Sequence, residues 1–289
     1  MWAVEVRNTM CRLLGIVASE PTEFALVLRD APRSLASLSH QHPDGWGIAI
    51  HDKDAQFAHG RRWHLQKGTE RAAADPSFHA LAGRSRGHVL VAHIRQKTVG
   101  PTKIENTHPF VRDGWVFAHN GTIPCCKALR QAARPERLAE IAGDTDSEVL
   151  FAYLLSRLDE AGLLHLEDEH ARAEATRLVA QTAQDLRCKD IGAFNFLLSD
   201  GHTCFAHRYK RTLFALERGP EDPVRPTRAI TDATTLVTRW TSRRRAIFVA
   251  SERITDEPWR EVEEGTLLRI DREPDPHLVA VETTERVAS

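Results

Sequence analysis

The chain has 289 residues, which allows one large domain or two smaller ones. Lys and Arg number 39 against 40 Asp and Glu, so the formal net charge is -1, and this balance argues against a nucleic-acid binder with its usual basic face. No stretch approaches the ~18 consecutive apolar residues of a membrane span, and the first ten residues lack the apolar core of a signal peptide. We therefore expect a cytoplasmic protein that binds neither nucleic acid nor membrane.

Cysteine and histidine usage gives no sign of a disulfide framework or a bound metal. The cysteines are odd in number and scattered, with no C-x-x-C pair: Cys11, Cys125, Cys126, Cys188 and Cys204. His40 and His42 form an H-x-H pair, but no motif supplies the further ligands that a zinc site needs. We expect no metal site and no cofactor.

The first half of the chain reads mainly as strands. Short apolar runs predict strands at residues 13–18, 46–50, 89–94 and 115–119. The last of these is expected to end at Asn120-Gly121, a dipeptide typical of turns. A helical stretch interrupted at Pro32 is expected over residues 23–38, and residues 76–87 are interpreted as a polar approach to the following strand.

In the second half of the chain the spacing of apolar residues becomes helical and then returns to that of strands. Helical spacing predicts helices at residues 146–158 and 171–186. Strands return at residues 193–198, 204–207, 212–216, 246–250 and 266–270, and residues 218–228 are interpreted as a loop. Strands, then helices, then strands again favour an α+β layered fold over a βαβ repeat. With no sign of a second domain, the sequence predicts a single α+β domain.

Three polar clusters stand at the ends of predicted strands or before a predicted helix. They are His93-Ile94-Arg95-Gln96, His119-Asn120-Gly121 and Gly143-Asp144-Thr145-Asp146-Ser147-Glu148. Each has an ordinary structural explanation, since buried histidines are usually satisfied by backbone groups and Asn-Gly is usually a turn. The third cluster fits a helix N-terminal cap with an acidic first turn. No single cluster therefore identifies a function.

Cys11 differs from the other cysteines because it directly follows Met10. Methionine before a small residue is removed by an initiator-processing peptidase, so translation from Met10 would leave Cys11 with a free α-amine beside its thiol. A base would then lie next to the nucleophile without a separate histidine. The ordinary pKa values, roughly 8.5 for the thiol and roughly 7.7–8.0 for the amine, suit proton transfer between them. The alternative is a buried structural cysteine near the start of a strand.

Six motifs in this order resemble those of class II glutamine amidotransferases, in particular their small, free-standing, γ-glutamyl-hydrolase-like branch. They are Cys11-Arg12-Leu13-Leu14-Gly15 behind a methionine, Asp44-Gly45-Trp46-Gly47, His93-Ile94-Arg95-Gln96, Glu105-Asn106-Thr107-His108-Pro109-Phe110, His119-Asn120-Gly121 and Asp144-Thr145-Asp146-Ser147-Glu148. The resemblance implies a four-layer αββα N-terminal-nucleophile (Ntn) hydrolase sandwich. It implies a single domain over residues 11–289, with residues 1–10 as a removed leader or a misassigned start.

The resemblance also implies roles for residues of these motifs. Cys11 would attack the side-chain amide carbon of glutamine, and the Asn120 side chain and the Gly121 N–H would stabilise the resulting oxyanion. Arg95 would hold the substrate α-carboxylate through its forked guanidinium, a geometry that lysine cannot copy. Asp146 would accept from the substrate α-ammonium. Together Arg95 and Asp146 would select γ-glutamyl amides over other amides.

Other residues of the motifs are expected near the substrate. Thr107 and His108 are expected to bind substrate or to organise the loop at the pocket. Trp46 is expected to line the pocket, although a core position is equally compatible with the sequence. His93 and His119 precede key residues and are interpreted as orienting loops rather than transferring protons.

The implied function is an amidohydrolase that acts on glutamine or a small γ-glutamyl compound and releases glutamate with ammonia or an amine. One alternative is a glutaminase subunit that delivers ammonia to a separate synthetase partner. Another alternative, from a different class, is an inactive sandwich that binds amino acids or a protein partner. Turnover by the isolated protein favours the first, turnover only with a partner the second, and an N-terminus that stays blocked the third.

Overall fold

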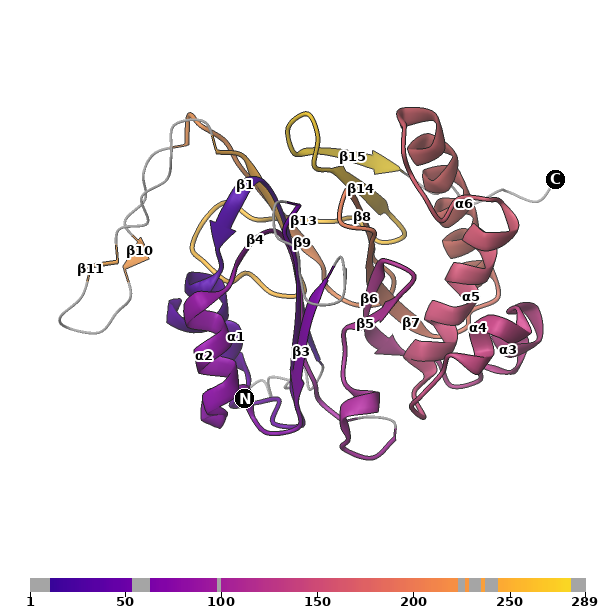
Figure 1. Cartoon of the computed structure of the whole chain (residues 1–289), viewed down its shortest axis with the longest axis horizontal. Coiled ribbons are helices and arrows are strands. Elements are labelled where there is room, and N and C mark those ends of the chain that lie inside the picture. The colour runs from indigo at the N-terminus through magenta and orange to yellow at the C-terminus, as the bar shows by residue number, and fades with distance from the viewer. Residues whose placement is uncertain are drawn as a thin grey trace, which may run out of the picture.

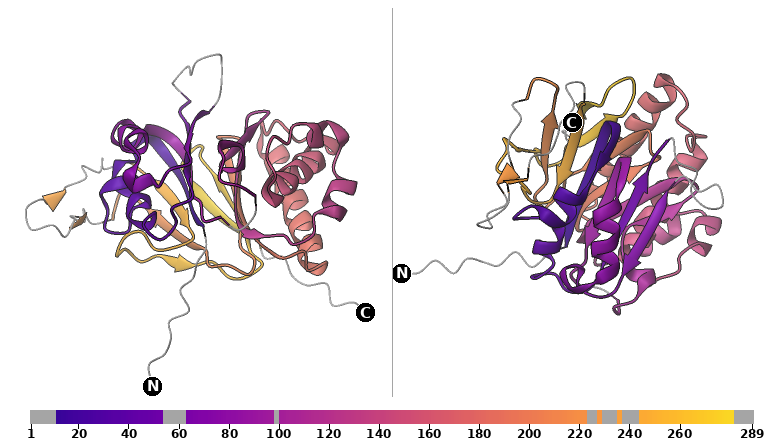
Figure 2. Two further views of the ribbon diagram at one scale, coloured as in Figure 1. Left: turned by 90° about the horizontal axis from the view of Figure 1, so that it is seen from below. Right: turned by 60° about the vertical axis from the view of Figure 1, so that its left-hand side comes forward.

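Two antiparallel β-sheets lie face to face between two layers of helices in the computed structural model of the chain (Figure 1). The structure describes residues 11–53, 63–97, 100–222, 227–228, 235–236 and 244–281. From left to right in Figure 1 the layers are α1 with α2, the two sheets, and α3 to α6, and Figure 2 shows the same layers from below. This four-layer αββα arrangement in one domain confirms the predicted fold class.

The first sheet has seven strands, with the strand that follows Cys11 at its centre. The order is β13 (Arg260–Glu261), β9 (Phe214–Arg218), β12 (Ala246–Ala250), β1 (Arg12–Glu23), β4 (Arg86–Ile94), β2 (Trp46–His51) and β3 (His64–Gly68). Its outer face is covered by a π-helical turn (Leu26–Asp30), α1 (Leu35–Leu38), a 3-10 turn (Ala72–Ala74) and α2 (Pro76–Arg84). A separate two-stranded ribbon pairs β10 (Thr227–Arg228) with β11 (Thr235–Leu236).

The second sheet has six strands and carries the longer helices. The order is β15 (His277–Val281), β14 (Leu267–Asp271), β8 (Thr203–His207), β7 (Ala193–Ser199), β6 (Trp115–Thr122) and β5 (Phe110–Arg112). Its helices are α3 (Lys127–Ala132), α4 (Pro135–Ala139), α5 (Asp146–Glu160) and α6 (Glu169–Cys188), and a 3-10 turn (Ile104–Asn106) precedes β5. Among the residues that the structure describes, no helix is both long and apolar enough to cross a bilayer.

Strand alternation sorts the side chains between the helical layers and the gap between the sheets. On β1, Leu14 packs in the core beneath α1 and α2, whereas Leu13 packs in the core between the sheets. On β6, Phe117 packs beneath the helices of the second sheet, whereas Ala118 faces the gap. Residues of both sheets therefore meet in this gap, where β1 and β4 contact β6.

One sequence-based interpretation is wrong at α2. Residues 76–87 are not a polar approach to a strand, because Pro76–Arg84 forms a helix. Asp75 caps it by accepting from the Ser77 N–H at 2.8 Å, and Pro76 occupies the first turn, where its missing N–H costs nothing. The helix buries Phe78 and Leu81 against the first sheet. The Asp-Pro start and the spacing of these two apolar residues are the helix signals in this segment.

The expected end of the strand at Asn120-Gly121 is also wrong. β6 continues to Thr122, and Asn120 and Gly121 pair with Asn195 and Phe194 of β7. The turn preference of Asn-Gly is overridden because both residues stay in register with β7, and pairing within the sheet outweighs a local preference.

The other expected strands and helices occur close to their expected places with shifted ends, and β3, β5, β11, β13, β15, α3 and α4 are additional. The loop expected over residues 218–228 is shorter, since Arg218 ends β9 and Thr227–Arg228 forms β10. Residues 223–226 of that segment lie outside the described residues.

Gly47 on β2 lies directly against the segment that leads into β5. A Cβ atom at Gly47 would lie 2.0 Å from the carbonyl oxygen of His108. No side chain fits there without moving the backbone that places His108.

We expect Gly47→Ala to lower the free energy of unfolding by about 3 kcal/mol or more, because the added methyl overpacks against backbone. Urea unfolding measures the change. Gly219→Ala is the matched control, since nothing lies within 4 Å of a Cβ atom at Gly219. Equal stabilities of the two variants would contradict this account of the sheet packing.

Candidate active site

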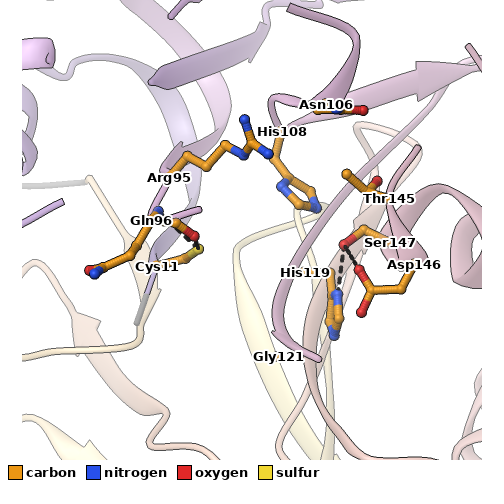
Figure 3. Close-up of a pocket in the computed structure, with 10 residues that line it drawn as sticks. All are labelled: Cys11, Arg95, Gln96, Asn106, His108, His119, Gly121, Thr145, Asp146 and Ser147. Atoms are coloured by element: carbon orange, nitrogen blue, oxygen red, sulfur yellow. Dashed lines mark hydrogen bonds between the residues drawn. The ribbon is translucent and has the colours of Figure 1, made fainter. Parts of the chain in front are cut away.

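A pocket opens between the sheets at the end where β1 begins and β4 ends. About 320 Å³ of space, part of it open to solvent, lies among its lining residues. Its lining residues, drawn in Figure 3, are Cys11, Arg95, Gln96, Asn106, His108, His119, Gly121, Thr145, Asp146 and Ser147. The structure thus brings together five of the residues expected at the site: Cys11, Arg95, His108, Gly121 and Asp146.

These residues come from segments far apart in the sequence. Cys11 directly precedes β1, and Arg95 directly follows β4, where antiparallel pairing sets Arg12 opposite Ile94. Gly121 lies in β6 of the other sheet, and Asp146 is the first residue of α5. The contact between the sheets therefore brings a thiol and a guanidinium from one side toward a strand and a helix terminus on the other.

The Cys11 sulfur is held by the main chain of Gln96. The thiol donates to the Gln96 carbonyl at 3.2 Å, and the Gln96 N–H donates to the sulfur at 3.2 Å. The Gln96 side chain points away from the pocket (Figure 3), and its Oε1 lies 2.5 Å from His42 Nδ1.

Burial raises the pKa of the Cys11 thiol. The hydrogen bond from Gln96 and the positive charges of Arg95 and Arg12 offset part of that rise. The thiol is therefore protonated near neutral pH, and it needs a base before it can act as a nucleophile.

Arg95 is buried, and two backbone carbonyls orient its guanidinium. Nη1 donates to the Pro101 carbonyl at 3.2 Å and Nη2 to the Gly100 carbonyl at 3.4 Å. The main chain of Arg95 is also fixed, since its N–H donates to the Gly45 carbonyl at 2.8 Å and its carbonyl accepts from the Asp44 N–H at 3.2 Å. A buried, oriented fork of this kind suits a carboxylate partner.

His119 and Asp146 fix the start of α5 on the opposite wall. The Ala193 carbonyl can only accept, so His119 Nε2–H donates to it at 3.3 Å and His119 Nδ1 accepts from the Ser147 hydroxyl at 2.8 Å. Burial lowers the pKa of His119, so the ring is neutral at pH 7. Asp146 Oδ2 accepts from the Ile123 N–H at 2.6 Å, which ties the start of α5 to the end of β6.

Some buried polar atoms of the pocket have no hydrogen-bond partner among the described residues. They are both ring nitrogens of His108 and the hydroxyl of Thr145. The His108 ring lies between His93 and Phe110, with ring centroids 4.4 and 4.7 Å away. Burial lowers the pKa of His108 well below its usual value, so the neutral ring offers one donor and one acceptor. Because buried polar groups are normally paired, these atoms favour a ligand site here.

Asn120 and Gly121 are neighbours on β6 and present opposite faces. Gly121 lines the pocket, and a Cβ atom there would lie 1.9 Å from the Ala193 carbonyl oxygen, so only glycine fits. Asn120 is buried and does not line the pocket, but it shares its strand face with Ala118 in the core between the sheets. By the same alternation Cys11 is on the Leu13 side of β1, which faces that gap.

The sequence matches the family described as class-II glutamine amidotransferases over residues 10–288. The chain belongs to this family. Escherichia coli YafJ, whose name assigns it provisionally as a glutamine amidotransferase, is 31% identical over 222 residues, which are 73% of this chain and 78% of the relative. Gamma-glutamyl-hercynylcysteine sulfoxide hydrolase of Mycobacterium tuberculosis is 35% identical over 128 residues, which are 39% of this chain and 50% of the relative.

A crystal structure described as a predicted glutamine amidotransferase from Pseudomonas aeruginosa has the same fold with a TM-score of 0.59. It is 26% identical in sequence, and the match covers 90% of this chain and 96% of that one. The family, its free-standing branch and the Ntn-type sandwich expected from the six motifs are therefore confirmed.

Trp46 and Thr107 of this class II amidotransferase do not line the pocket. Trp46 lies on the other face of the first sheet, edge-on to Phe78 at 5.1 Å, and its indole N–H donates to Asp75 Oδ2 at 2.8 Å. The structure gives Trp46 the core position that the sequence left open. Thr107 is buried, and its hydroxyl donates to the Lys103 carbonyl at 3.0 Å, which braces the loop before β5.

The pocket of the amidotransferase also contains residues that the sequence-based site omits. They are Gln96, Asn106, His119, Thr145 and Ser147. All of them lie inside the six motifs, so membership of a motif is the available signal. Which residues of a motif face the pocket depends on how the two sheets pack, and a strand's own sequence does not specify that.

The pKa of His93 in the amidotransferase is lowered to about 3. Burial is the main cause, and the neighbouring His119 and Arg95 lower this pKa further. Below pH 6.5 the unfolded chain binds a proton that the folded protein excludes. The stability contributed by neutral His93 is therefore complete above pH 6.5 and is lost progressively as the pH falls toward 3, by up to about 1.4 kcal/mol per pH unit.

We expect His93→Phe, a ring of similar size that cannot titrate, to give a shallower loss of unfolding free energy between pH 7.5 and 5 than the unsubstituted protein. Urea unfolding at several pH values measures both slopes. Only the slopes are compared, because the substitution also changes stability at every pH. Identical slopes would show that His93 is not held neutral by burial.

Proposed function

We propose that the protein is an amidohydrolase that cleaves the γ-amide of glutamine or of a small γ-glutamyl compound with the Cys11 thiol. The observation that supports this most is the composition of one pocket. It gathers a thiol, a buried guanidinium, a carboxylate at a helix start and a strand glycine around one pocket. A structural cysteine would need none of these neighbours.

Two charged groups suit the head group of an α-amino acid. The Arg95 fork would bind the α-carboxylate in bidentate geometry, and the Asp146 carboxylate would accept from the α-ammonium. His108 lies in the same pocket and would bind substrate through its unpartnered nitrogens. Thr107 would act indirectly, by bracing the loop that carries His108.

Attack of the sulfur on the amide carbon would place negative charge on the amide oxygen. The Asn120 side-chain amide and the Gly121 N–H would donate to that oxyanion, and each such donor typically contributes ~2.7–4 kcal/mol to the transition state. Collapse of the intermediate forms a γ-glutamyl thioester and breaks the C–N bond, so ammonia or an amine leaves with the transferred proton. Water then cleaves the thioester and releases glutamate.

The raised pKa of the Cys11 thiol calls for a nearby base. A free α-amine on Cys11 would supply it within the same residue, since its pKa is roughly 7.7–8.0. We accordingly take residues 11–289 as the active glutamine amidotransferase domain, with residues 1–10 as a removed leader or a misassigned start. The name of the mycobacterial relative describes a hydrolase of a γ-glutamyl compound, which supports a γ-glutamyl substrate here.

We expect the active protein to begin at Cys11, because a peptide bond to residue 10 would remove the base. Intact-mass measurement of active material tests this. Full activity of a protein that retains Met1 would rule out the α-amine as base.

A glutamine-mimicking diazoketone should label Cys11, and exposed Cys125 and Cys188 are the internal controls, because they are accessible thiols outside the pocket.

Kinetics should separate binding of the head group from stabilisation of the oxyanion. Arg95→Lys should lower kcat/KM for glutamine by about 2–4 kcal/mol in free-energy terms, since the charge remains but the fork is lost. The rate at which a small neutral reagent alkylates Cys11 should be the same in Arg95→Lys as in the unsubstituted protein. Asn120→Ala should lower kcat more than it raises KM, because the oxyanion exists only after attack.

Steady-state kinetics with glutamine and with an analogue lacking the α-carboxylate measure these effects. Equal turnover of both compounds by the unsubstituted protein would contradict the proposed carboxylate recognition. Glutamine turnover that occurs only when a synthetase is added would favour the ammonia-supplying subunit instead.

A further inference from the structure

Asn106 is completely buried, and its carboxamide joins two separate segments of the pocket wall. Its Nδ2 donates to the Pro101 carbonyl at 3.0 Å, and its Oδ1 accepts from the Asp144 N–H at 2.7 Å. Its Nδ2 also lies 3.4 Å from Asp144 Oδ2. One side chain therefore connects the loop before β5 with the turn before α5.

The first connection leads directly to Arg95. The Pro101 carbonyl that accepts from Asn106 also accepts from Arg95 Nη1, at 3.2 Å. A carbonyl oxygen has two lone pairs, and here Asn106 takes one and Arg95 the other. The position of this carbonyl, and with it the direction of the guanidinium, depends on the Asn106 amide.

The second connection leads to Asp146. Asp144 stands two residues before the start of α5, and Gly143 beside it donates its N–H to Glu148 Oε2 at 2.6 Å. A Cβ atom at Gly143 would lie 2.4 Å from Asn106 Oδ1 and 2.5 Å from Glu148 Oε2. The turn that leads into Asp146 is thus pressed against the Asn106 side chain without spare room.

Only a side chain with a donor and an acceptor can make both connections. The carboxamide has an NH₂ group for Pro101 and an oxygen for the Asp144 N–H, whereas a carboxylate has no donor. In Asn106→Asp the new carboxylate would also lie beside the Asp144 carboxylate, where like charges repel. The buried amide is therefore matched to the two segments that it joins.

We propose that Asn106 is a positioning residue that sets the spacing between Arg95 and Asp146, and so makes the site selective for a complete α-amino acid head group. This inference rests on the proposed function, in which Arg95 binds the α-carboxylate and Asp146 the α-ammonium. Because Asn106 reaches both, its loss displaces both recognition groups together. Loss of either recognition group alone affects only one end of the substrate.

Three amide substrates test recognition of the α-carboxylate and of the α-ammonium separately. They are glutamine, 4-aminobutanamide, which lacks the α-carboxylate, and glutaramate, which lacks the α-ammonium. Arg95→Lys should lower mainly the preference for glutamine over 4-aminobutanamide, and Asp146→Asn mainly the preference over glutaramate. Asn106→Asp and Asn106→Leu should lower both preferences, by about 10- to 100-fold each, the scale for misplacing a recognition group by about 1 Å. Lys103→Gln is the matched control and should keep both preferences. It removes an exposed ion pair to Asp144, the residue that Asn106 also contacts, and leaves the buried amide in place.

Ratios of kcat/KM separate positioning from a loss of folded protein. A smaller active fraction lowers kcat/KM for all three substrates by one factor and leaves both ratios unchanged. If Asn106→Leu does not fold, Asn106→Asp, which keeps the size of the side chain, decides the question.

A fall of both ratios in the Asn106 variants supports the inference. Unchanged ratios, or a fall of only one, overturn it while the proposed function stands. Absence of any preference for glutamine in the unsubstituted protein would overturn the proposed head-group recognition and this inference with it.

Discussion

The contact of β1 and β4 with β6 across the gap between the sheets is the constraint on which the site depends. It sets Cys11 and Arg95, at neighbouring strand ends of one sheet, against Gly121 of the other. The approach is close enough that Gly47 meets the His108 backbone, so the loop carrying His108 is held by the same packing. A change in the sheet spacing would move every group of the pocket at once.

The pocket also depends on how its buried polar groups are satisfied. The Arg95 guanidinium, the start of α5 and the turn before it are each held by hydrogen bonds to backbone groups or to a buried side chain. Burial keeps His93, His108 and His119 neutral, so these three rings add no positive charge to the pocket wall. A rigid wall of this kind suits recognition of a small zwitterion, because few groups need to be ordered when the ligand binds.

Local sequence signals located most of the secondary structure, and they failed where tertiary contacts compete with local preference. The helices at α5 and α6 follow from apolar spacing alone. Asn120-Gly121 has a turn preference, yet it continues β6 because β7 pairs with both residues. Short strands such as β3 and β5 carry too few residues for a clear alternation, and their strand conformation depends on pairing with β2 and β6.

The sequence by itself determined the family, the layered fold and half of the residues that line the pocket, because six ordered motifs match those of class II glutamine amidotransferases. It did not determine which motif residues face the pocket. Trp46 and Gly47 are adjacent, yet alternation sends the indole to the outer core and sets the glycine against His108. Asn106 received no role from its motif, because its two partners, Pro101 and Asp144, come from different segments. Only the packing of two sheets and a helix start brings those partners within hydrogen-bonding distance of one buried amide.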